Sequence, residues 1–541
     1  MSTTICETAY GTLRGTLYPN HVAFLGIPFA QPPVNELRFR APRKPKSWNG
    51  IRDATKYGSV APQVIQNPER APVFTNPRAD EVMSEDCLYL NVWAPKAALG
   101  GQEKLPVMVY IHGVYLIVLH PLFLPLKPTI LPTEGGGLRI GSGSQSLFDG
   151  GELVQTAPVI IVTFNYRMGY FGWMASEELR DNSPETVAEG FGGHANPGLL
   201  DMRAAFLWVK ENIAYFGGDP DRVTSFGESA GGMLQTYLIS CFPNDSLFRY
   251  SILQSGSALA PWDMAPFSQD VFDQVCAKCS LPKHLSGSAK VDALRAVPAS
   301  DIMKAFTEIF YNGPMRTRPV IDGVVVREHP LKAIRNGRCM KLDGAILGYV
   351  TDEGSFRGQQ FSKREDYEAF VKHVWPGSLS QRILKQYPFN EAIPYKAGSE
   401  LMTDVEFVAG AYATANELIS QKVPVYMYRW DVAPEMTKEW NARVHHGAEL
   451  LFTFNQKRYL MTPNELRLGA LASKAWISFA TTGSPAGFHG WPQYKGDGGA
   501  VVVFTPGGIE VGDDRWHQEG IKFWRKNEFE ADAAGDQHHK L

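Results

Sequence analysis

The chain has 541 residues, of which 44% are hydrophobic and 20% are charged, and its formal net charge at pH 7 is −3. This composition is that of an ordinary globular protein with ample material for a core. Because the net charge is small and no basic block or stripe is present, the composition excludes nucleic acid as a partner. Nothing in the sequence indicates an oligomeric state.

The cysteine pattern gives an expectation about metal binding, and the two ends of the chain give one about cellular location. The six cysteines show no metal-ligand pattern apart from Cys276 and Cys279, which we interpret as two thiols on a helix, so we expect no metal site. Residues 1–10 lack the charged segment, apolar core and cleavage site of a secretory signal. We expect an intracellular, cytoplasmic protein, while the terminal His539-Lys540-Leu541 is similar to a peroxisomal ending and keeps that location open.

The one candidate for a membrane span is the apolar stretch 114–135. It contains prolines at positions 121, 125, 128 and 132, which would break a spanning helix and leave backbone groups unsatisfied in lipid. We therefore expect no membrane span.

Short apolar runs alternate with amphipathic stretches along the chain. The runs predict buried strands at 107–111, 159–164, 223–226, 345–350 and 425–428. Between two of these runs, a stripe at spacings of three and four predicts a helix that ends near 216–220, with Leu199, Met202, Phe206, Val209 and Ile213 on its apolar face. Such alternation predicts an α/β fold with a mostly parallel central sheet flanked by helices.

No internal repeat or long linker divides the chain, so we predict a single domain over 1–524. Helical patterning at about 260–340 predicts a helical cap over the carboxyl edge of the sheet. The polar residues 525–541 predict a frayed C-terminal tail.

Residues 227–231 read Gly-Glu-Ser-Ala-Gly, directly after a predicted strand and before a predicted helix. A nucleophile elbow needs this arrangement, because the serine is strained and larger neighbours would clash where strand and helix nearly touch. We therefore predict that Ser229 is a nucleophile rather than part of a structural turn. A serine hydroxyl needs a base and an acid that orients the base, and in this fold the acid precedes the histidine.

Further motifs are spread from about Tyr10 to Phe523. They are Phe24-Leu-Gly-Ile-Pro-Phe-Ala-Gln-Pro-Pro33, Leu37-Arg-Phe-Arg40, Ser84-Glu-Asp-Cys-Leu-Tyr-Leu-Asn91, Asn165-Tyr-Arg167, Asn196-Pro-Gly-Leu-Leu-Asp201, Phe216-Gly-Gly-Asp-Pro220, Gly227-Glu-Ser-Ala-Gly-Gly232 and Gln254-Ser-Gly256. With them the chain resembles the type-B carboxylesterase and cholinesterase-like family of α/β-hydrolases. The resemblance implies an α/β-hydrolase fold and a serine carboxylic ester hydrolase that needs no cofactor.

The resemblance also assigns the remaining members of a catalytic triad. The family's acid matches Glu353, with its neighbour Asp352 as the fallback. The family's histidine is followed by glycine and then a glutamate, which matches His446 in His446-Gly-Ala-Glu449. His445 lacks the following glycine and is treated as a neighbour.

The resemblance further implies an oxyanion hole and two supporting residues. The backbone N–H groups of Gly136, Gly137 and Ala230 match the oxyanion hole. Glu228 and Ser255 match supporting positions, where a turn or packing role is the alternative.

Several family features are missing from this chain. The cysteine partners that would pair with Cys87 and Cys279 in secreted relatives are absent, which agrees with a reducing compartment. The segment between Gln63 and Cys87 lacks the tryptophan with which cholinesterases hold a quaternary ammonium, and Phe74 is its nearest aromatic. Choline esters are therefore not expected as substrates.

The glycine loop of the oxyanion hole is interrupted by residues 114–135. If they are removed, Tyr110-Ile-His-Gly113 joins Gly136-Gly-Leu138 and forms a loop typical of acyl-transfer hydrolases. The interruption is a loop that acts as a lid, a tolerated insertion, or the translation of a retained intron. We favour the intron, because excision restores the motif without a missing residue and because valine codons begin with the bases that open an intron.

The leading hypothesis is a serine esterase that acts on esters of small to medium acyl groups. The alternative is a catalytically impaired or silent esterase-like binding protein, because the oxyanion loop is interrupted. Silent relatives usually replace a member of the triad, whereas Ser229, Glu353 and His446 are all present here.

Overall fold

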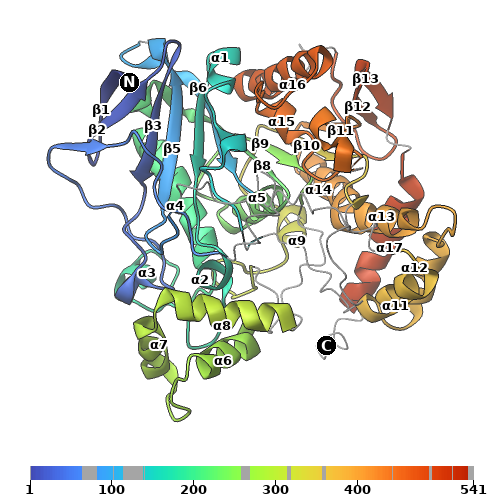
Figure 1. Cartoon of the computed structure of the whole chain (residues 1–541), viewed down its shortest axis with the longest axis horizontal. Coiled ribbons are helices and arrows are strands. Elements are labelled where there is room, and N and C mark those ends of the chain that lie inside the picture. Colours follow the sequence, from blue (N-terminus) through green and yellow to red (C-terminus); the bar gives the residue numbers. More distant parts are fainter. Residues whose placement is uncertain are drawn as a thin grey trace.

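The computed structural model describes residues 2–63, 82–101, 103–113, 138, 140–257, 268–312, 319–355, 361–440, 443–485, 490–513 and 516–533 (Figure 1). The insertion 114–135 lies outside the described residues, as do Gly136, Gly137, Phe74 and residues 534–541.

A 13-stranded sheet forms the centre of the described part of the chain, in the order β1-β2-β3-β5-β7-β6-β8-β9-β10-β11-β12-β13, with β4 paired to β2. The strands are β1 (Ser2–Thr8), β2 (Gly11–Leu17), β3 (His21–Pro28), β4 (Ile51–Asp53), β5 (Tyr89–Pro95), β6 (Leu105–Ile111), β7 (Ile160–Phe164), β8 (Gly218–Glu228), β9 (Tyr250–Gln254), β10 (Gly344–Val350), β11 (Val425–Trp430), β12 (Ala500–Thr505) and β13 (Gly508–Asp513). From β7 to β12 all neighbours are parallel, whereas the pairs toward both edges are antiparallel, apart from β4, which is parallel to β2. The predicted α/β class is confirmed, and the five predicted strands are β6, β7, β8, β10 and β11.

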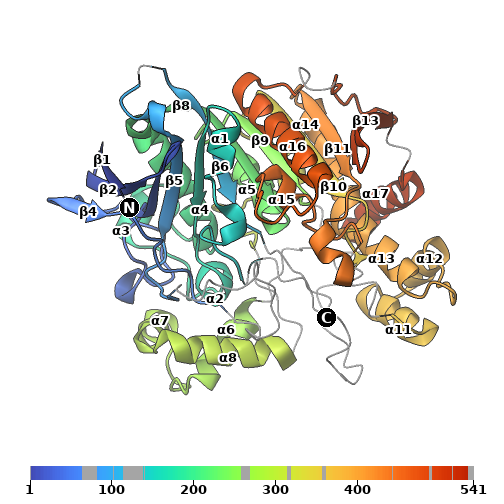
Figure 2. The same ribbon diagram turned by 45° about the horizontal axis from the view of Figure 1, so that its top comes forward.

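Helices cover both faces of this sheet (Figures 1 and 2). The helices of the described residues, including those that do not pack on the sheet, are α1 (Leu153–Thr156), α2 (Gly169–Trp173), α3 (Pro184–Ala188), α4 (Pro197–Asn212), α5 (Ala230–Cys241), α6 (Ser268–Lys278), α7 (Gly287–Ala296), α8 (Ala299–Asn312), α9 (Pro330–Arg335), α11 (Arg364–Val374), α12 (Ser378–Gln386), α13 (Tyr395–Thr403), α14 (Ala409–Ser420), α15 (Leu450–Thr453), α16 (Pro463–Thr482) and α17 (Gln518–Ala533). The predicted apolar stripe of α4 is buried along its whole length.

The alternation of side chains along β6 explains why the sheet needs helices on both sides. Val107, Val109 and Ile111 belong to a core cluster that includes residues of α4 and α5. Met108 and Tyr110 belong to a second cluster on the other face, shared with α16. Since successive side chains of a strand point to opposite faces, an uninterrupted apolar run is buried from both sides.

Two groups of helices stand apart from the sheet in both views (Figures 1 and 2). α6, α7 and α8 share a core of their own and fall within the region where a helical cap was expected. α9 does not join them, because it packs on α5 and α14. The second group, α11, α12 and α13, has a separate core and was not predicted from the sequence.

The C-terminal segment is more ordered than its polar sequence suggested. α17 continues to Ala533, past the boundary expected at 525, because Ile521 and Trp524 pack into the core clusters. Among the described helices, none is long and apolar enough to cross a bilayer. All six cysteines are free thiols, with Cys276 in α6 and Cys279 one residue beyond its end.

A buried ion pair fixes the loop after β7. The Arg167 guanidinium donates to both oxygens of Asp201, at 2.7 and 2.6 Å, and the two side chains are 2% and 0% exposed. The same loop places the Asn165 side chain on the N–H of Gly143 and the Tyr166 hydroxyl on the carbonyl of His112. The pair therefore supports both flanks of the interrupted glycine loop.

We expect Arg167→Met to lower the free energy of unfolding by about 3–5 kcal/mol, because Asp201 would remain buried without its cationic partner. The measurement is urea denaturation followed by tryptophan fluorescence. Arg364→Met is the control, since the pair of Arg364 with Glu391 is exposed and should contribute at most about 1 kcal/mol. Equal losses in the two variants would contradict this prediction.

Candidate active site

The predicted nucleophile Ser229 lies at the turn between β8 and α5. Its backbone has φ of 58° and ψ of −123°, a region that costs a residue other than glycine about 1–3 kcal/mol. The Ser229 N–H donates to the Gln254 carbonyl at 2.8 Å, and the Ser229 carbonyl accepts from the Met233 N–H at 2.9 Å. Both backbone groups are thus satisfied, which keeps the strained conformation in place.

The turn is possible because β6 and α5 almost touch beside it. A Cβ atom on Gly231 would lie 2.0 Å from the carbonyl oxygen of Ile111, the last residue of β6. That distance is far inside van der Waals contact, so no side chain fits at position 231. The glycine two residues after Ser229 is therefore required by the approach of the helix to the strand.

The two described flanks of the interrupted loop meet beside the same turn. A Cβ on Gly113 would lie 2.1 Å from the Glu228 carbonyl oxygen and 3.0 Å from the Ser229 Cβ. On the far flank, a Cβ on Gly141 would lie 2.8 Å from the Gly113 carbonyl oxygen, and the Gly141 N–H donates to the Gln63 side chain at 2.8 Å. The chain thus leaves and re-enters the described structure at adjacent points next to Ser229.

Of the three residues predicted for the oxyanion hole, the structure describes Ala230. It is the buried first residue of α5, where the N–H groups of a helix are free of intrahelical partners. Gly136 and Gly137 lie outside the described residues.

Glu353 and His446 are brought together by the loops that follow β10 and β11. Glu353 Oε2 lies 2.5 Å from His446 Nδ1, and Glu353 Oε1 accepts from the Val350 N–H at 2.9 Å. The glutamate is 4% exposed. The carboxylate therefore orients the imidazole through Nδ1 and leaves Nε2 free for another partner.

The two alternatives to these residues have other contacts. Asp352 pairs with Arg443 at 2.7 Å and accepts from the Ser399 hydroxyl. The His445 ring lies near the His446 carbonyl at 2.9 Å, and burial lowers the pKa of His445 to about 4. Neither residue takes the place of Glu353 or His446 in the pair.

Glu228 is the second carboxylate at the imidazole. Its Oε1 lies 3.1 Å from His446 Nε2, and the side chain is 1% exposed. Burial by itself lowers the pKa of His446, but the carboxylates of Glu228 and Glu353 outweigh it and raise the pKa to about 9. Burial also raises the pKa of Glu228 well above its ordinary value, although His446 opposes this. His446 is thus held between Glu353 and the residue that precedes Ser229.

A third buried carboxylate, Glu449, was used in the sequence only to recognise His446. It is fully buried and accepts from the Gln254 side chain at 3.4 Å. Burial, together with the charge on Glu353, raises the pKa of Glu449 to about 7. Since three carboxylates surround one imidazole in a buried site, like-charge repulsion keeps the cluster from ionising completely.

Ser255 and Phe407 complete the surroundings of the site. Ser255 has a positive φ of 46°, its N–H donates to the Gly348 carbonyl at 2.8 Å, and its buried hydroxyl has no hydrogen-bond partner among the described residues. The Phe407 ring lies 4.5 Å from the His446 ring, centroid to centroid. Sequence reasoning missed Phe407, because one aromatic residue in a helix carries no local signal.

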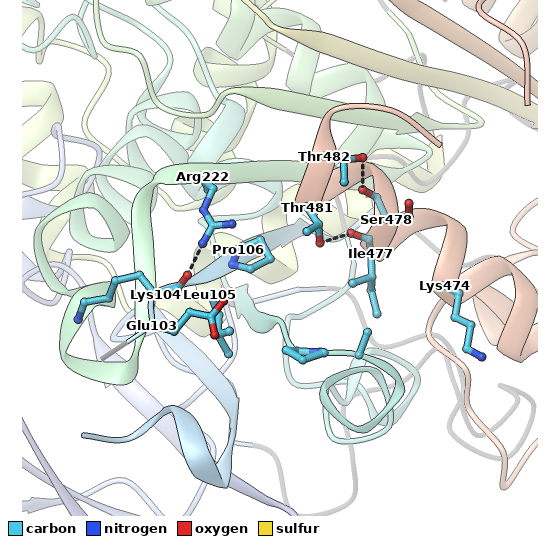
Figure 3. A pocket seen from close by; sticks show the side chains of 12 residues that line it. Glu103, Lys104, Leu105, Pro106, Arg222, Lys474, Ile477, Ser478, Thr481 and Thr482 are labelled. Carbon is cyan, nitrogen blue, oxygen red and sulfur yellow. Dashed lines mark hydrogen bonds between the residues drawn. The ribbon is translucent and has the colours of Figure 1, made fainter. Parts of the chain in front are cut away.

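A surface cavity of about 380 Å³ lies elsewhere, at the amino ends of β6 and β7 (Figure 3). Leu105, Pro106 and Pro158 line it together with Ile477 and Thr481 of α16. The close-up shows the side chains of Lys104 and Lys474 pointing away from its centre. β6 separates this cavity from Gly113, so the cavity is not part of the Ser229 site.

Comparison with known proteins places this geometry in context. The model of the Carboxylesterase family matches residues 2–121 and 124–510. Para-nitrobenzyl esterase from Bacillus subtilis (strain 168) is 32% identical over 514 residues, which cover 91% of this chain and 93% of that protein. Fumonisin B1 esterase from Sphingopyxis macrogoltabida is 32% identical over 511 residues, covering 90% and 84%. A solved structure of PNB esterase superposes with a TM-score of 0.76 at 30% identity, covering 96% of this chain and 100% of that one.

We expect the imidazole of His446 to stay protonated above its ordinary pKa of 6.5, and Glu228→Gln to lower that pKa by removing one of the three neighbouring carboxylates. Because the folded-state pKa is the higher one, the stabilisation is complete below pH 6.5 and is lost as the pH rises through about 9. The measurement is an NMR titration of 13C-labelled histidine, assigned with His446→Gln. An unchanged pKa in Glu228→Gln would show that the 3.1 Å contact does not exist in solution.

Proposed function

The chain belongs to the carboxylesterase family and is a carboxylic ester hydrolase, and on this premise we propose that it cleaves esters of small to medium acyl groups through an acyl-enzyme on Ser229. The observation that carries the proposal is the contact of Glu353 with His446 Nδ1 at 2.5 Å, together with the position of Nε2, which lies 3.1 Å from Oε1 of Glu228, the neighbour of Ser229. The strained backbone of Ser229 at the tip of β8 supports the same assignment.

In the proposed reaction the Ser229 oxygen attacks the ester carbonyl carbon while His446 Nε2 accepts the hydroxyl proton. The tetrahedral intermediate collapses, the bond to the alcohol oxygen breaks, and His446 returns its proton to the leaving alcohol. Water then attacks the acyl-enzyme with His446 as base, and the carboxylic acid leaves as Ser229 regains its proton. Glu353 remains ionised and stabilises the imidazolium.

Glu228 has a specific place in this proposal. Its Oε1 lies 3.1 Å from His446 Nε2, the atom that must also meet the Ser229 hydroxyl. We infer that Glu228 and His446 share one proton across this contact, and that Nε2 can accept the proton of Ser229 when the shared proton rests on the Glu228 carboxylate, whose protonated form burial favours. This gives Glu228 a supporting role beyond packing.

The oxyanion of the intermediate would meet the N–H groups of Ala230, Gly136 and Gly137. The position of Ala230 supports this assignment, as does the contact of Gly113 with the Glu228 carbonyl, which brings one end of the glycine loop to the nucleophile. Losing a single donor of this kind costs on the order of 100-fold in rate.

The substrate class stays broad. The two bacterial relatives are named for unlike esters, para-nitrobenzyl esters and fumonisin B1. Hydrolysis rates measured over a panel of esters would therefore identify which alcohol and acyl groups the enzyme prefers. The free state of the six thiols supports an intracellular, reducing location.

A second candidate, a silent binding protein, is favoured only by the interruption at 114–135. Against it, Ser229, Glu353 and His446 are all present, and Glu353 and His446 are in contact. The two candidates differ in whether Ser229 is reactive.

We expect a fluorophosphonate probe to label the full chain and Ser229→Ala to abolish labelling, because only an activated serine attacks the phosphorus. The measurement is intact-protein mass spectrometry. Ser225→Ala is the matched control, since Ser225 lies buried in the same strand and its hydroxyl has no partner among the described residues, so labelling should be unchanged. Absence of label on the full chain would favour the silent protein.

We expect deletion of residues 114–135 to raise kcat for a short p-nitrophenyl ester by about 100-fold or more. The deletion joins Gly113 directly to Gly136, which should let the N–H groups of the proposed oxyanion hole point at the oxyanion. The measurement compares the purified full chain with the deletion variant. Equal rates would mean that the interruption does not impair the oxyanion hole.

A further inference from the structure

One helical segment lies against both loops of the predicted acid–histidine pair. α13 (Tyr395–Thr403), a π-helical turn (Asp404–Val408) and α14 (Ala409–Ser420) follow one another without a break. Its π turn and α14 pack beside β10, and α14 also packs beside β11 (Figures 1 and 2), the strands that precede the loops of Glu353 and His446. It is therefore placed to align the two residues with each other.

The first half of the segment holds the loop that carries Glu353. The Thr403 hydroxyl accepts from the Gly354 N–H at 2.9 Å, and the Ser399 hydroxyl donates to Asp352. A Cβ on Gly354 would lie 2.2 Å from the Ser399 carbonyl oxygen, so helix and loop are in direct backbone contact. Both chain neighbours of Glu353 are thus fixed by α13.

The second half of the segment reaches His446 through Phe407. The two rings are 4.5 Å apart, centroid to centroid, and tilted by 40°. Phe407 is 8% exposed and also contacts Met233, whose N–H is bonded to the Ser229 carbonyl. The imidazole therefore has Glu353 and Glu228 at its nitrogens and an aromatic ring at its side.

The π-helical turn explains how one segment contacts both loops. Residues four apart in an α-helix advance by about 40° beyond a full turn, so Ser399, Thr403 and Phe407 would drift around a regular helix. In a π turn each hydrogen bond spans one residue more, which reduces the rotation per residue between Thr403 and Phe407 and so limits that drift. Phe407 therefore reaches His446 while Ser399 and Thr403 contact the loop of Glu353.

Buried polar contacts anchor the π turn at its first residue. Asp404 is 1% exposed, and its carboxylate accepts from the Tyr387 hydroxyl at 2.7 Å and contacts His517 Nδ1 at 2.5 Å. The Tyr387 hydroxyl in turn accepts from the Trp524 indole N–H at 3.0 Å. Because a buried carboxylate needs these partners, the turn is tied to α17 and to the residue after α12.

We propose that Phe407, presented by the π-helical turn Asp404–Val408, is a positioning residue that holds the imidazole of His446 with Nδ1 at Glu353 and Nε2 toward the turn that carries Glu228 and Ser229. The proposal rests on the role proposed above for His446 as the base. Phe407 acts on the reaction through the histidine, so its effect is the same for every ester that uses this base.

The test is Phe407→Leu in the full chain, which keeps an apolar side chain but removes the ring. We expect the rate of fluorophosphonate labelling at Ser229 to fall about tenfold, because small errors in the placement of a catalytic group have effects of this order or larger. We expect kcat for a p-nitrophenyl acetate and a p-nitrophenyl butyrate to fall by the same factor, with KM unchanged. Phe407→Tyr, which retains the ring, should restore most of the rate.

Phe389→Leu is the matched control. Phe389 is 7% exposed and packs in the core shared by α11, α12 and α13, where its ring contacts Tyr367 rather than His446. The control should lose stability without a change in labelling rate. A labelling rate of Phe407→Leu equal to that of the unmodified chain would overturn the proposal, as would a loss confined to one of the two esters, which would make Phe407 only a wall of the substrate pocket.

The proposed function and this inference can fail separately. If the unmodified chain is not labelled, the proposed function fails, and the NMR signal of His446 then decides on Phe407. A shift and broadening of that signal in Phe407→Leu, absent in Phe389→Leu, would support the positioning role. An unchanged signal would overturn it.

Discussion

The site depends on the close approach of three backbone segments at the tip of β8. α5 can begin at Ala230 only because Gly231 passes against the Ile111 carbonyl, where a Cβ would lie at 2.0 Å. The same approach brings Gly113, two residues beyond Ile111, against the Glu228 carbonyl. Strand order therefore does more than form a core: it brings the residues after β6, β8 and β9 to one point. This close approach forces Ser229 into a strained backbone conformation with positive φ, and its two backbone hydrogen bonds offset part of the free energy of that strain.

Electrostatics set the second constraint. Glu228, Glu353 and Glu449 lie around one imidazole with hardly any access to water, and burial raises the pKa of both Glu228 and Glu449. Water cannot screen three adjacent charges there, so protons must be shared among the groups. Glu353 lies 2.5 Å from Nδ1 through its Oε2 and accepts from the Val350 N–H through its Oε1. The cluster thus orients His446, the proposed base, through Nδ1 and places Glu228, whose protonated form burial favours, next to the proposed nucleophile Ser229.

Much of this could be predicted from the sequence, for identifiable reasons. Parallel strands buried on both faces leave continuous apolar runs, so β6, β8 and β10 were visible, and the elbow around Ser229 has a local pattern of small residues. Glu353 and His446 were found by resemblance rather than by spacing. Phe407, Glu449 and the helices α11 to α13 were missed, because their roles depend on contacts across the fold. The helical continuation to Ala533 was missed for the same reason: Trp524 packs against α11 and α12 residues that are distant in sequence.

The two flanks of the interrupted glycine loop are held by contacts among described residues. Gly113 is held against Glu228, Gly141 by the Gln63 side chain, and the Leu138 carbonyl by the Gly169 N–H at 2.8 Å. These contacts do not involve residues 114–137, so the scaffold around Ser229 stands without them. In the proposed reaction the N–H groups of Gly136 and Gly137 would take their direction from the residues that precede them in the chain. The proposal therefore expects the interruption to act on the stabilisation of the transition state rather than on the contact between Glu353 and His446.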